Sequence, residues 1–281
     1  MINFFDILLS ADFPFLRNAL LAGVLSSILF GTIGAVVTVR RIASLAGAIS
    51  HAVLGGIGLA LYLAAVGIAP RLPPIAGALA FAVLAAVIIG FVSLRAKQRE
   101  DTAINAIWAI GMSIGVLFMA KTPGYTDPSV WLFGNILLIS SQDLLLLAVL
   151  DIIVMFLAWR FYAQIEAVSF DEEFARVRGV RFNLVFMILL AVTAIAIVLL
   201  QTFVGIVMVI AMLTLPSGCS GVFSRSLGGM MLLSCIFSVV FSLAGVAAGW
   251  IFDLPVGAMT VIVAGAVFLG ISAWRTLCQR M

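Results

Sequence analysis

Residues 182–224 read FNLVFMILLAVTAIAIVLLQTFVGIVMVIAMLTLPSGCSGVFS, a run of 43 residues without a charged side chain. As one α-helix, rising about 1.5 Å per residue, this run would be about 60 Å long, twice the hydrocarbon thickness of a bilayer. It is therefore predicted to form two membrane-spanning helices joined by a tight turn near Gln201–Gly205.

The composition of the chain excludes a soluble globular protein. Hydrophobic residues make up 64% of the chain and charged residues 10%, and the mean hydropathy is +1.30. The formal net charge of +3 is explained by charged loops, so no nucleic-acid partner is predicted. No Walker A pattern is present, so the chain is not expected to be an enzyme that hydrolyses nucleotide itself. The three cysteines have no metal-type spacing and are expected to be free thiols.

Charged or Pro-rich stretches divide the rest of the chain into further segments that are long enough to span a membrane. The candidates are Asn18–Val39, Ile42–Ala69, Leu72–Leu94, Thr102–Ala120, Leu144–Tyr162, Ser226–Phe252 and Leu254–Trp274. Together with the two spans in 182–224, they predict an all-α, polytopic membrane protein with about nine transmembrane helices, or eight if one segment is merged or re-entrant. Residues 1–281 are expected to form a single transmembrane domain, since the longest polar segment is Gln164–Arg181.

The basic residues predict the orientation of the chain. With nine spans the loops alternate sides, and only Arg17, Arg71 and Lys121 fall on one side, which leaves 15 − 3 = 12 of the Lys and Arg residues on the other. Cytoplasmic loops of membrane proteins are rich in Lys and Arg. The N-terminus is therefore expected outside and the C-terminus in the cytoplasm.

The segment Ser169–Val180, SFDEEFARVRGV, is predicted to be a short cytoplasmic helix. Ser169 and Glu172, three residues apart, fit a capping box. Acidic residues at the start, basic residues near the end and a glycine at the C′ position agree with a helix ending at this point. The residues with these roles are Asp171, Glu173, Arg176, Arg178 and Gly179.

Phe170, Phe174 and Val177 recur at i, i+4 and i+7 of this segment and form one apolar stripe. A loop between two spans has no core of its own in which to bury such a stripe. The stripe either contacts a partner protein or lies in the lipid interface, and the pattern alone leaves both interpretations open.

His51 is the only histidine and lies inside an uncharged span, about 13 Å from its cytoplasmic start. Ionisable or metal-ligating side chains at this depth usually face a bundle interior or a polar pathway. Gly47 and Gly55 stand one turn before and after it, which would let a helix or a transport path approach. His51, with Ser50 and Gly47, is a candidate for a metal pathway. A histidine packed among helices is the alternative.

Asp151 is the second ionisable residue inside a predicted span. It could be a further metal ligand, a proton-coupled group or an acceptor for a hydroxyl on a neighbouring helix. We favour the structural interpretation, because the sequence identifies no partner.

Three shorter patterns are also informative. The segment Ser129–Ser141 is too short to span and is predicted to be a re-entrant or interfacial helix near an outer gate. Leu213–Gly221, with Pro216 inside, is predicted to interrupt a helix. The GxxxG pairs at 111/115 and 245/249 predict close helix packing. The candidate residues of the outer gate are Asp127, Trp131 and Asn135.

Several of these segments, taken in order, resemble the membrane permeases of bacterial ABC importers for divalent transition metals, the zinc, manganese and iron group. The resemblance covers nearly the whole chain. It is carried by SLAGAISHAVLGG (Ser44–Gly56), DPSVWLFGNILLIS (Asp127–Ser140), FDEEFARVRGV (Phe170–Val180), the long pair of spans ending in LTLPSG, and FDLPVGAMTVIVAG (Phe252–Gly265).

The resemblance implies a type II-like ABC importer permease fold in the bacterial plasma (inner) membrane. It also implies a permease homodimer, two cytoplasmic ATPase subunits that use the ATP, and an extracytoplasmic metal-binding protein. No cofactor would be bound permanently, because the metal ion is the cargo. Residues Phe170–Gly179 match the family's coupling helix to the ATPase, and His51 matches a histidine of the metal path.

One position departs from the family pattern. Many members carry an aspartate four residues before this histidine, where this chain has Gly47. An imidazole without a nearby carboxylate suits a hard ion such as manganese less well, so zinc ranks ahead of manganese and iron. The alternatives are a proton-coupled secondary carrier for a metal ion and an ABC permease for a metal chelate.

Overall fold

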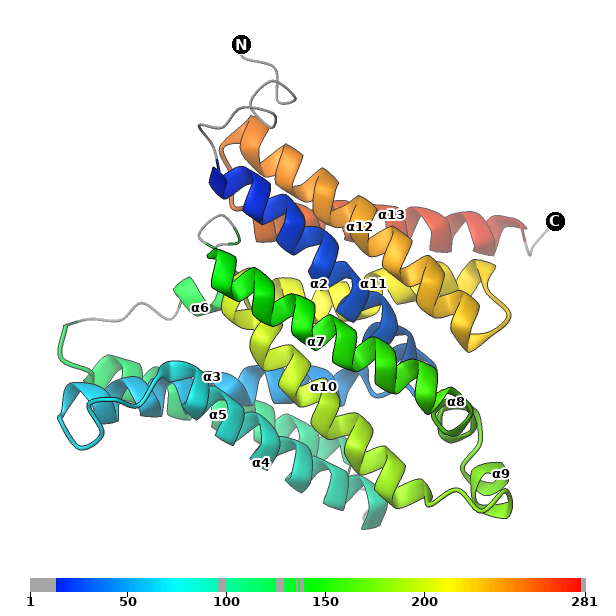
Figure 1. Cartoon of the computed structure of the whole chain (residues 1–281), viewed down its shortest axis with the longest axis horizontal. Helices are drawn as coiled ribbons and strands as arrows, with labels where there is room; N and C mark the ends of the chain where they lie inside the picture. The colour runs from blue at the N-terminus through cyan, green and yellow to red at the C-terminus, as the bar shows by residue number, and fades with distance from the viewer. Residues whose placement is uncertain (1–13, 96–99, 125–128, 135, 137–138, 279–281) are drawn as a thin grey trace. The chain divides into compact units, whose positions relative to one another are not determined.

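The computed structural model describes residues 14–95, 100–124, 129–134, 136 and 139–278. In these ranges, nine helices are long and apolar enough to cross a membrane, as predicted. They are α2 (Pro14–Val39), α3 (Ala43–Ala65), α4 (Pro74–Arg95), α5 (Glu100–Lys121), α7 (Ser141–Arg160), α10 (Phe182–Val204), α11 (Ile206–Phe223), α12 (Leu227–Phe252) and α13 (Val256–Cys278) (Figure 1). The short helices are α6 (Ser129–Phe133), α8 (Tyr162–Phe170) and α9 (Glu172–Val177).

The described residues divide into two compact units, each considered by itself below. Unit 1 comprises the chain up to Thr38, Phe133–Arg160 and the chain from Phe203. Unit 2 comprises Val39–Leu132 and Phe161–Thr202. The prediction of a single domain over residues 1–281 stays a prediction.

The core of unit 2 is a tight packing of α3 against α4 and α5, which lie side by side in Figure 1. A Cβ atom added at Gly55 of α3 would lie 2.7 Å from the Gly111 carbonyl oxygen of α5. One added at Gly115 would lie 2.6 Å from the Leu54 carbonyl carbon. Glycines at these positions allow the backbones to approach, which confirms the packing predicted from the first GxxxG pair.

In unit 1, α11, α12 and α13 pack together (Figure 1). A Cβ atom at Gly249 of α12 would lie 2.9 Å from Val256 of α13, and Gly245 lies against Thr260. Ser220 of α11 and Ser234 of α12 share a hydrogen bond of 2.7 Å. Small residues therefore bring these helices together, as the second GxxxG pair predicts.

The turn predicted between the two spans of 182–224 is confirmed at Gly205. This residue has φ +82° between α10 and α11, a left-handed conformation that glycine adopts at little cost. Gly134, with φ +60°, packs its Cα against Gly205 and Val204, leaving no room for a side chain. Glycine is thus required on both sides of this contact.

The structure corrects two predictions. The segment Leu213–Gly221 does not interrupt a helix, because α11 runs through Pro216 to Phe223. Buried hydroxyls next to the proline satisfy nearby carbonyls: Ser217 donates to Leu213 O at 3.3 Å and Ser220 to Ser217 O at 2.9 Å.

The second correction concerns Ser129–Ser141, which is not one continuous helix. The helix α6 covers only Ser129–Phe133, and the positive φ of Gly134 ends it. Ile136 and Ile139 are buried beyond that turn. The contact of Gly134 with Gly205 decides where this helix stops, and the sequence alone does not reveal it.

Candidate functional site

His51 lies on α3 of unit 2, stacked on Trp108 of α5. The two ring centroids are 5.0 Å apart and the ring planes are inclined by 35°. His51 is half-buried, and its Nδ1 atom is buried without a hydrogen-bond partner among the described residues. The exposed part of the ring therefore comes from its other atoms, among which Nε2 is the second nitrogen that can bind a metal ion.

Trp108 was not identified from the sequence. The signal that could have found it is its spacing, because Trp108 stands three residues before Gly111 and so shares the face of α5 that packs on α3. An aromatic ring on this face holds the imidazole from one side.

The glycines around His51 have two different environments. A Cβ atom at Gly47 would meet no atom within 4 Å, so this side of α3 is open. Gly55, one turn after the histidine, is packed against α4 and α5 as described above. Ser50 is fully buried, and its hydroxyl donates to Ala46 O at 2.9 Å. The open space next to the imidazole thus lies toward Gly47.

Asp151 lies on α7 of unit 1, in the other unit from His51. The residue is 5% exposed, and neither carboxylate oxygen has a hydrogen-bond partner among the described residues. No hydroxyl in this part of the chain therefore donates to Asp151, as its interpretation as a hydrogen-bond acceptor would require.

A closed metal site of the kind that holds structural zinc is not found among the described residues, where no three His, Cys, Asp or Glu side chains cluster. The structure describes the three cysteines as free thiols: Cys219 is buried, Cys235 half-buried and Cys278 exposed. The prediction of free thiols is confirmed.

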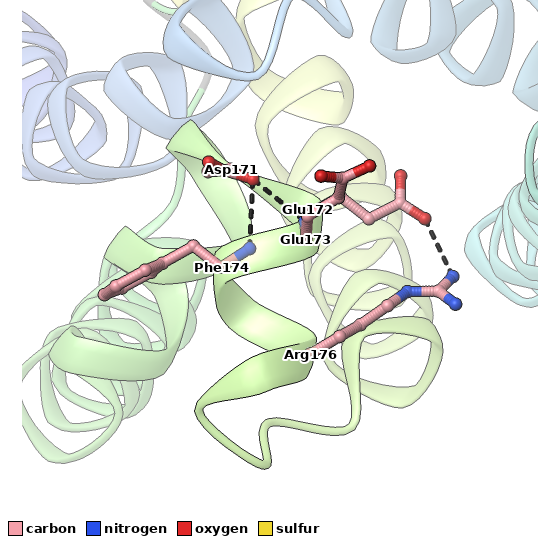
Figure 2. A network of polar contacts seen from close by, with 5 residues as sticks. All are labelled: Asp171, Glu172, Glu173, Phe174 and Arg176. Carbon is pink, nitrogen blue, oxygen red and sulfur yellow. Dashed lines mark hydrogen bonds and ion pairs between the residues drawn. The ribbon is translucent and has the colours of Figure 1, made fainter.

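The predicted short helix after α8 is present as α9, but its N-cap differs from the prediction. Asp171 is the N-cap: its Oδ1 accepts hydrogen bonds from the backbone N–H groups of Glu173 (2.9 Å) and Phe174 (3.0 Å), as Figure 2 shows. Ser169 belongs to α8, where its buried hydroxyl donates to Ile165 O at 2.6 Å. Asp171 is preferred because a carboxylate also interacts favourably with the positive end of the helix.

Three further contacts stabilise α9. Arg176 donates from Nη2 to Glu172 Oε1 at 2.8 Å, one turn apart along the helix (Figure 2). Gly179 has φ +77°, and its N–H donates to Arg176 O at 3.0 Å. Val180 N–H donates to Ala175 O at 3.0 Å, which completes the helix end predicted from the glycine.

The apolar stripe of this region is exposed in the chain. Phe170, Phe174 and Val177 are 62%, 47% and 87% exposed. Phe170 and Phe174 also line an open groove of about 520 Å³ between α8 and α9. This region thus presents apolar side chains that are largely exposed in the described part of the chain.

The candidate outer gate is described only in part. Trp131 lies on α6 and is half-buried. Asp127 and Asn135 lie outside the described residues.

Comparison with known proteins gives the family of the chain. The model of the ABC 3 transport family matches residues 12–275. A Chlamydia trachomatis protein named "Probable metal transport system membrane protein" is 35% identical over 264 residues, which cover 94% of this chain and 90% of that protein. "Manganese transport system membrane protein MntC" of Halalkalibacterium halodurans is 32% identical over 268 residues, which cover 94% and 88%.

The fold is shared with a solved structure, PsaBC from Streptococcus pneumoniae in complex with Fab. The TM-score is 0.81 at 29% sequence identity, and the match covers 92% of this chain and 91% of that chain. Since the family model and the relatives both extend over nearly the whole sequence, this chain belongs to the ABC 3 transport family.

Proposed function

We propose that this chain is the membrane permease subunit of an ATP-driven importer that takes up divalent transition-metal ions. The observation that carries the proposal is α9, a short helix held by the Asp171 cap with an uncovered apolar stripe. A permease driven by a separate ATPase needs such a surface, whereas a secondary carrier does not. The names of the relatives, which refer to metal and manganese transport, support the metal cargo.

The partners follow from this role. A cytoplasmic ATPase subunit docks on α9, where Phe170, Phe174 and Val177 are buried in the contact. The ATPase hydrolyses the ATP, and the permease has no enzymatic activity. A second copy of the chain forms the other half of the pathway, and an extracytoplasmic binding protein delivers the ion. The chain lies in the bacterial plasma membrane with its N-terminus outside and its C-terminus in the cytoplasm.

His51 contacts the passing ion on the metal pathway. His51 offers a single imidazole, which is stacked on Trp108 and has open space toward Gly47. One such ligand can bind an ion only weakly. Weak binding suits conduction, because an ion that is held tightly is not released. The high-affinity step is therefore assigned to the delivery protein.

Zinc is the first candidate for the transported ion, with manganese and iron next. Zinc binds neutral imidazole well, and the chain lacks at position 47 the carboxylate oxygen that manganese prefers. The manganese named for several relatives is the reason to test both ions.

The test is uptake by the complete transporter, with its ATPase and binding protein, in vesicles offered zinc, manganese or iron. The proposal expects ATP-dependent uptake of at least one of these ions, with zinc the fastest. Uptake of a metal chelate but of none of the bare ions would favour the chelate permease and contradict the proposal.

A further inference from the structure

The interior of unit 1 contains a polar cluster that the pathway at His51 does not use. At its centre is Asp151, whose two carboxylate oxygens are buried and unpartnered. A buried carboxylate in the membrane is strongly unfavourable unless a cation or a hydrogen-bond donor compensates for it. The described part of the chain supplies no such donor, so the group has an unused capacity for a ligand.

A cysteine from another helix is fixed beside the same region. The Cys235 thiol on α12 donates a weak hydrogen bond to Ile28 O of α2, with a sulfur–oxygen distance of 3.7 Å. Its Sγ also lies against Gly31 of α2, where a Cβ atom would collide with it. The glycine thus leaves the space that the sulfur occupies, next to Thr32.

Thr32 connects this cysteine to the helix of Asp151. Its hydroxyl donates to the Met155 Sδ of α7 at 3.6 Å. Met155 stands one turn after Asp151, on the same face of α7. Gly31 and Thr32 of α2 therefore lie against Cys235 of α12 and Met155 of α7, and Asp151 stands one turn from Met155.

The four side chains form a mixed set of oxygen and sulfur donors: a carboxylate, a thiol, a thioether and a hydroxyl. Thiolate and thioether ligands select softer ions such as zinc over manganese or magnesium. Only the carboxylate and the thiolate are strong ligands, so the ion would be held weakly. Weak binding is what a transported ion requires.

We propose that Asp151 and Cys235, supported by Thr32 and Met155, form a second transient binding site for a borderline-soft divalent cation such as zinc. This inference rests on the proposed function, because it assigns the site to the same cargo.

The test uses cobalt(II), a spectroscopic substitute for zinc, and the full-length chain in lipid nanodiscs. Replacing the other two cysteines, Cys219→Ser and Cys278→Ser, leaves Cys235 as the only thiol. This chain is expected to give a thiolate-to-cobalt charge-transfer band that zinc removes and magnesium does not. Adding Cys235→Ser should abolish the band. Asp151→Asn should lower the apparent cobalt affinity about tenfold or more, and Asp151→Glu should largely preserve it.

No band in the chain that keeps Cys235, or equal cobalt affinity with Asp151→Asn, would overturn the site. If the Asp151 variants do not fold, the test is the alkylation rate of Cys235 in the chain with its native aspartate. Zinc should slow this reaction, and an unchanged rate would overturn the site. A cobalt band without any metal uptake by the transporter would refute the proposed function and leave this site standing. Metal uptake without the band would refute this site alone.

Discussion

At the residue scale, the environment of each glycine on α3 decides what a substitution there would do. Gly47 borders open space, whereas Gly55 touches the backbone of α5. Both are glycines one turn from His51, so the sequence alone gives the same prediction for both positions. Only the packing separates a position that can accept a ligand from one that cannot.

We predict that Gly47→Asp folds normally and raises manganese uptake relative to zinc by severalfold. The new carboxylate would stand one turn from His51, and a Cβ atom at this position meets nothing within 4 Å. Gly55→Ala is the contrasting variant, because its Cβ atom would lie 2.7 Å from Gly111 O and should destabilise the chain by about 1–3 kcal/mol. Uptake assays and thermal unfolding measure the two effects. An unchanged metal preference in a well-folded Gly47→Asp chain would argue against a pathway at this position.

We also predict that His51→Ala lowers metal uptake about tenfold or more while the chain still assembles with its ATPase. The imidazole is the ligand that this helix offers, and removing it leaves Trp108 without its stacking partner. His51→Asp should retain part of the activity, because it restores an oxygen ligand. Uptake of zinc and manganese at the parental rate by the alanine variant would make His51 a packing residue.

How far the candidate site could be predicted varies with the residue. His51 was apparent because a lone ionisable group inside an apolar span is conspicuous. Trp108 was missed because its role depends on which face of α5 meets α3. The N-cap was misassigned to Ser169 because α8 continues through Ser169 to Phe170. Asp171 is then the residue at the junction of α8 and α9.

At the scale of elements, α9 combines strong local order with an exposed apolar face. The Asp171 cap, the Glu172–Arg176 pair and Gly179 define its two ends. Local interactions of this kind are visible in sequence, which is why the helix was predicted. Phe170 of the predicted stripe ends α8 instead, so the stripe is shared by two helices. The continuity of α11 through Pro216 was not predicted, because a proline inside a helix usually kinks or ends it.

We predict that Phe174→Asp reduces transport and weakens ATPase assembly, with a smaller loss for Phe174→Ala. Burying a phenylalanine against a partner contributes about 1.5–3 kcal/mol, and the aspartate adds a charge at the contact. Phe174→Leu is the matched control and should keep most of both activities. Co-purification of the ATPase and ATP-dependent uptake are the measurements. Full assembly and transport in the aspartate variant would remove α9 from the docking surface.

At the scale of the whole molecule, the number of spans was predictable because each span is set by length and hydropathy, and nine such helices are found in the described residues. The division of the described residues into two compact units was not predicted. It depends on contacts between segments far apart in the sequence, such as α2 with α12, which no local pattern encodes.

The orientation can be tested at Cys278, the exposed cysteine at the end of α13. We predict that a membrane-impermeant maleimide labels it in inverted vesicles but not in intact cells, because the distribution of basic residues predicts a cytoplasmic C-terminus. Cys278→Ser removes the labelled thiol and serves as the control. Labelling in intact cells would reverse the orientation.

We expect metal uptake through this chain to be powered by ATP on a partner subunit. The most direct measurement is zinc uptake by vesicles containing the complete transporter, with ATP or with only a proton gradient. We predict uptake that requires ATP and the ATPase subunits and does not depend on the proton gradient. Uptake driven by the proton gradient in vesicles without ATPase subunits would contradict it and would identify a secondary carrier.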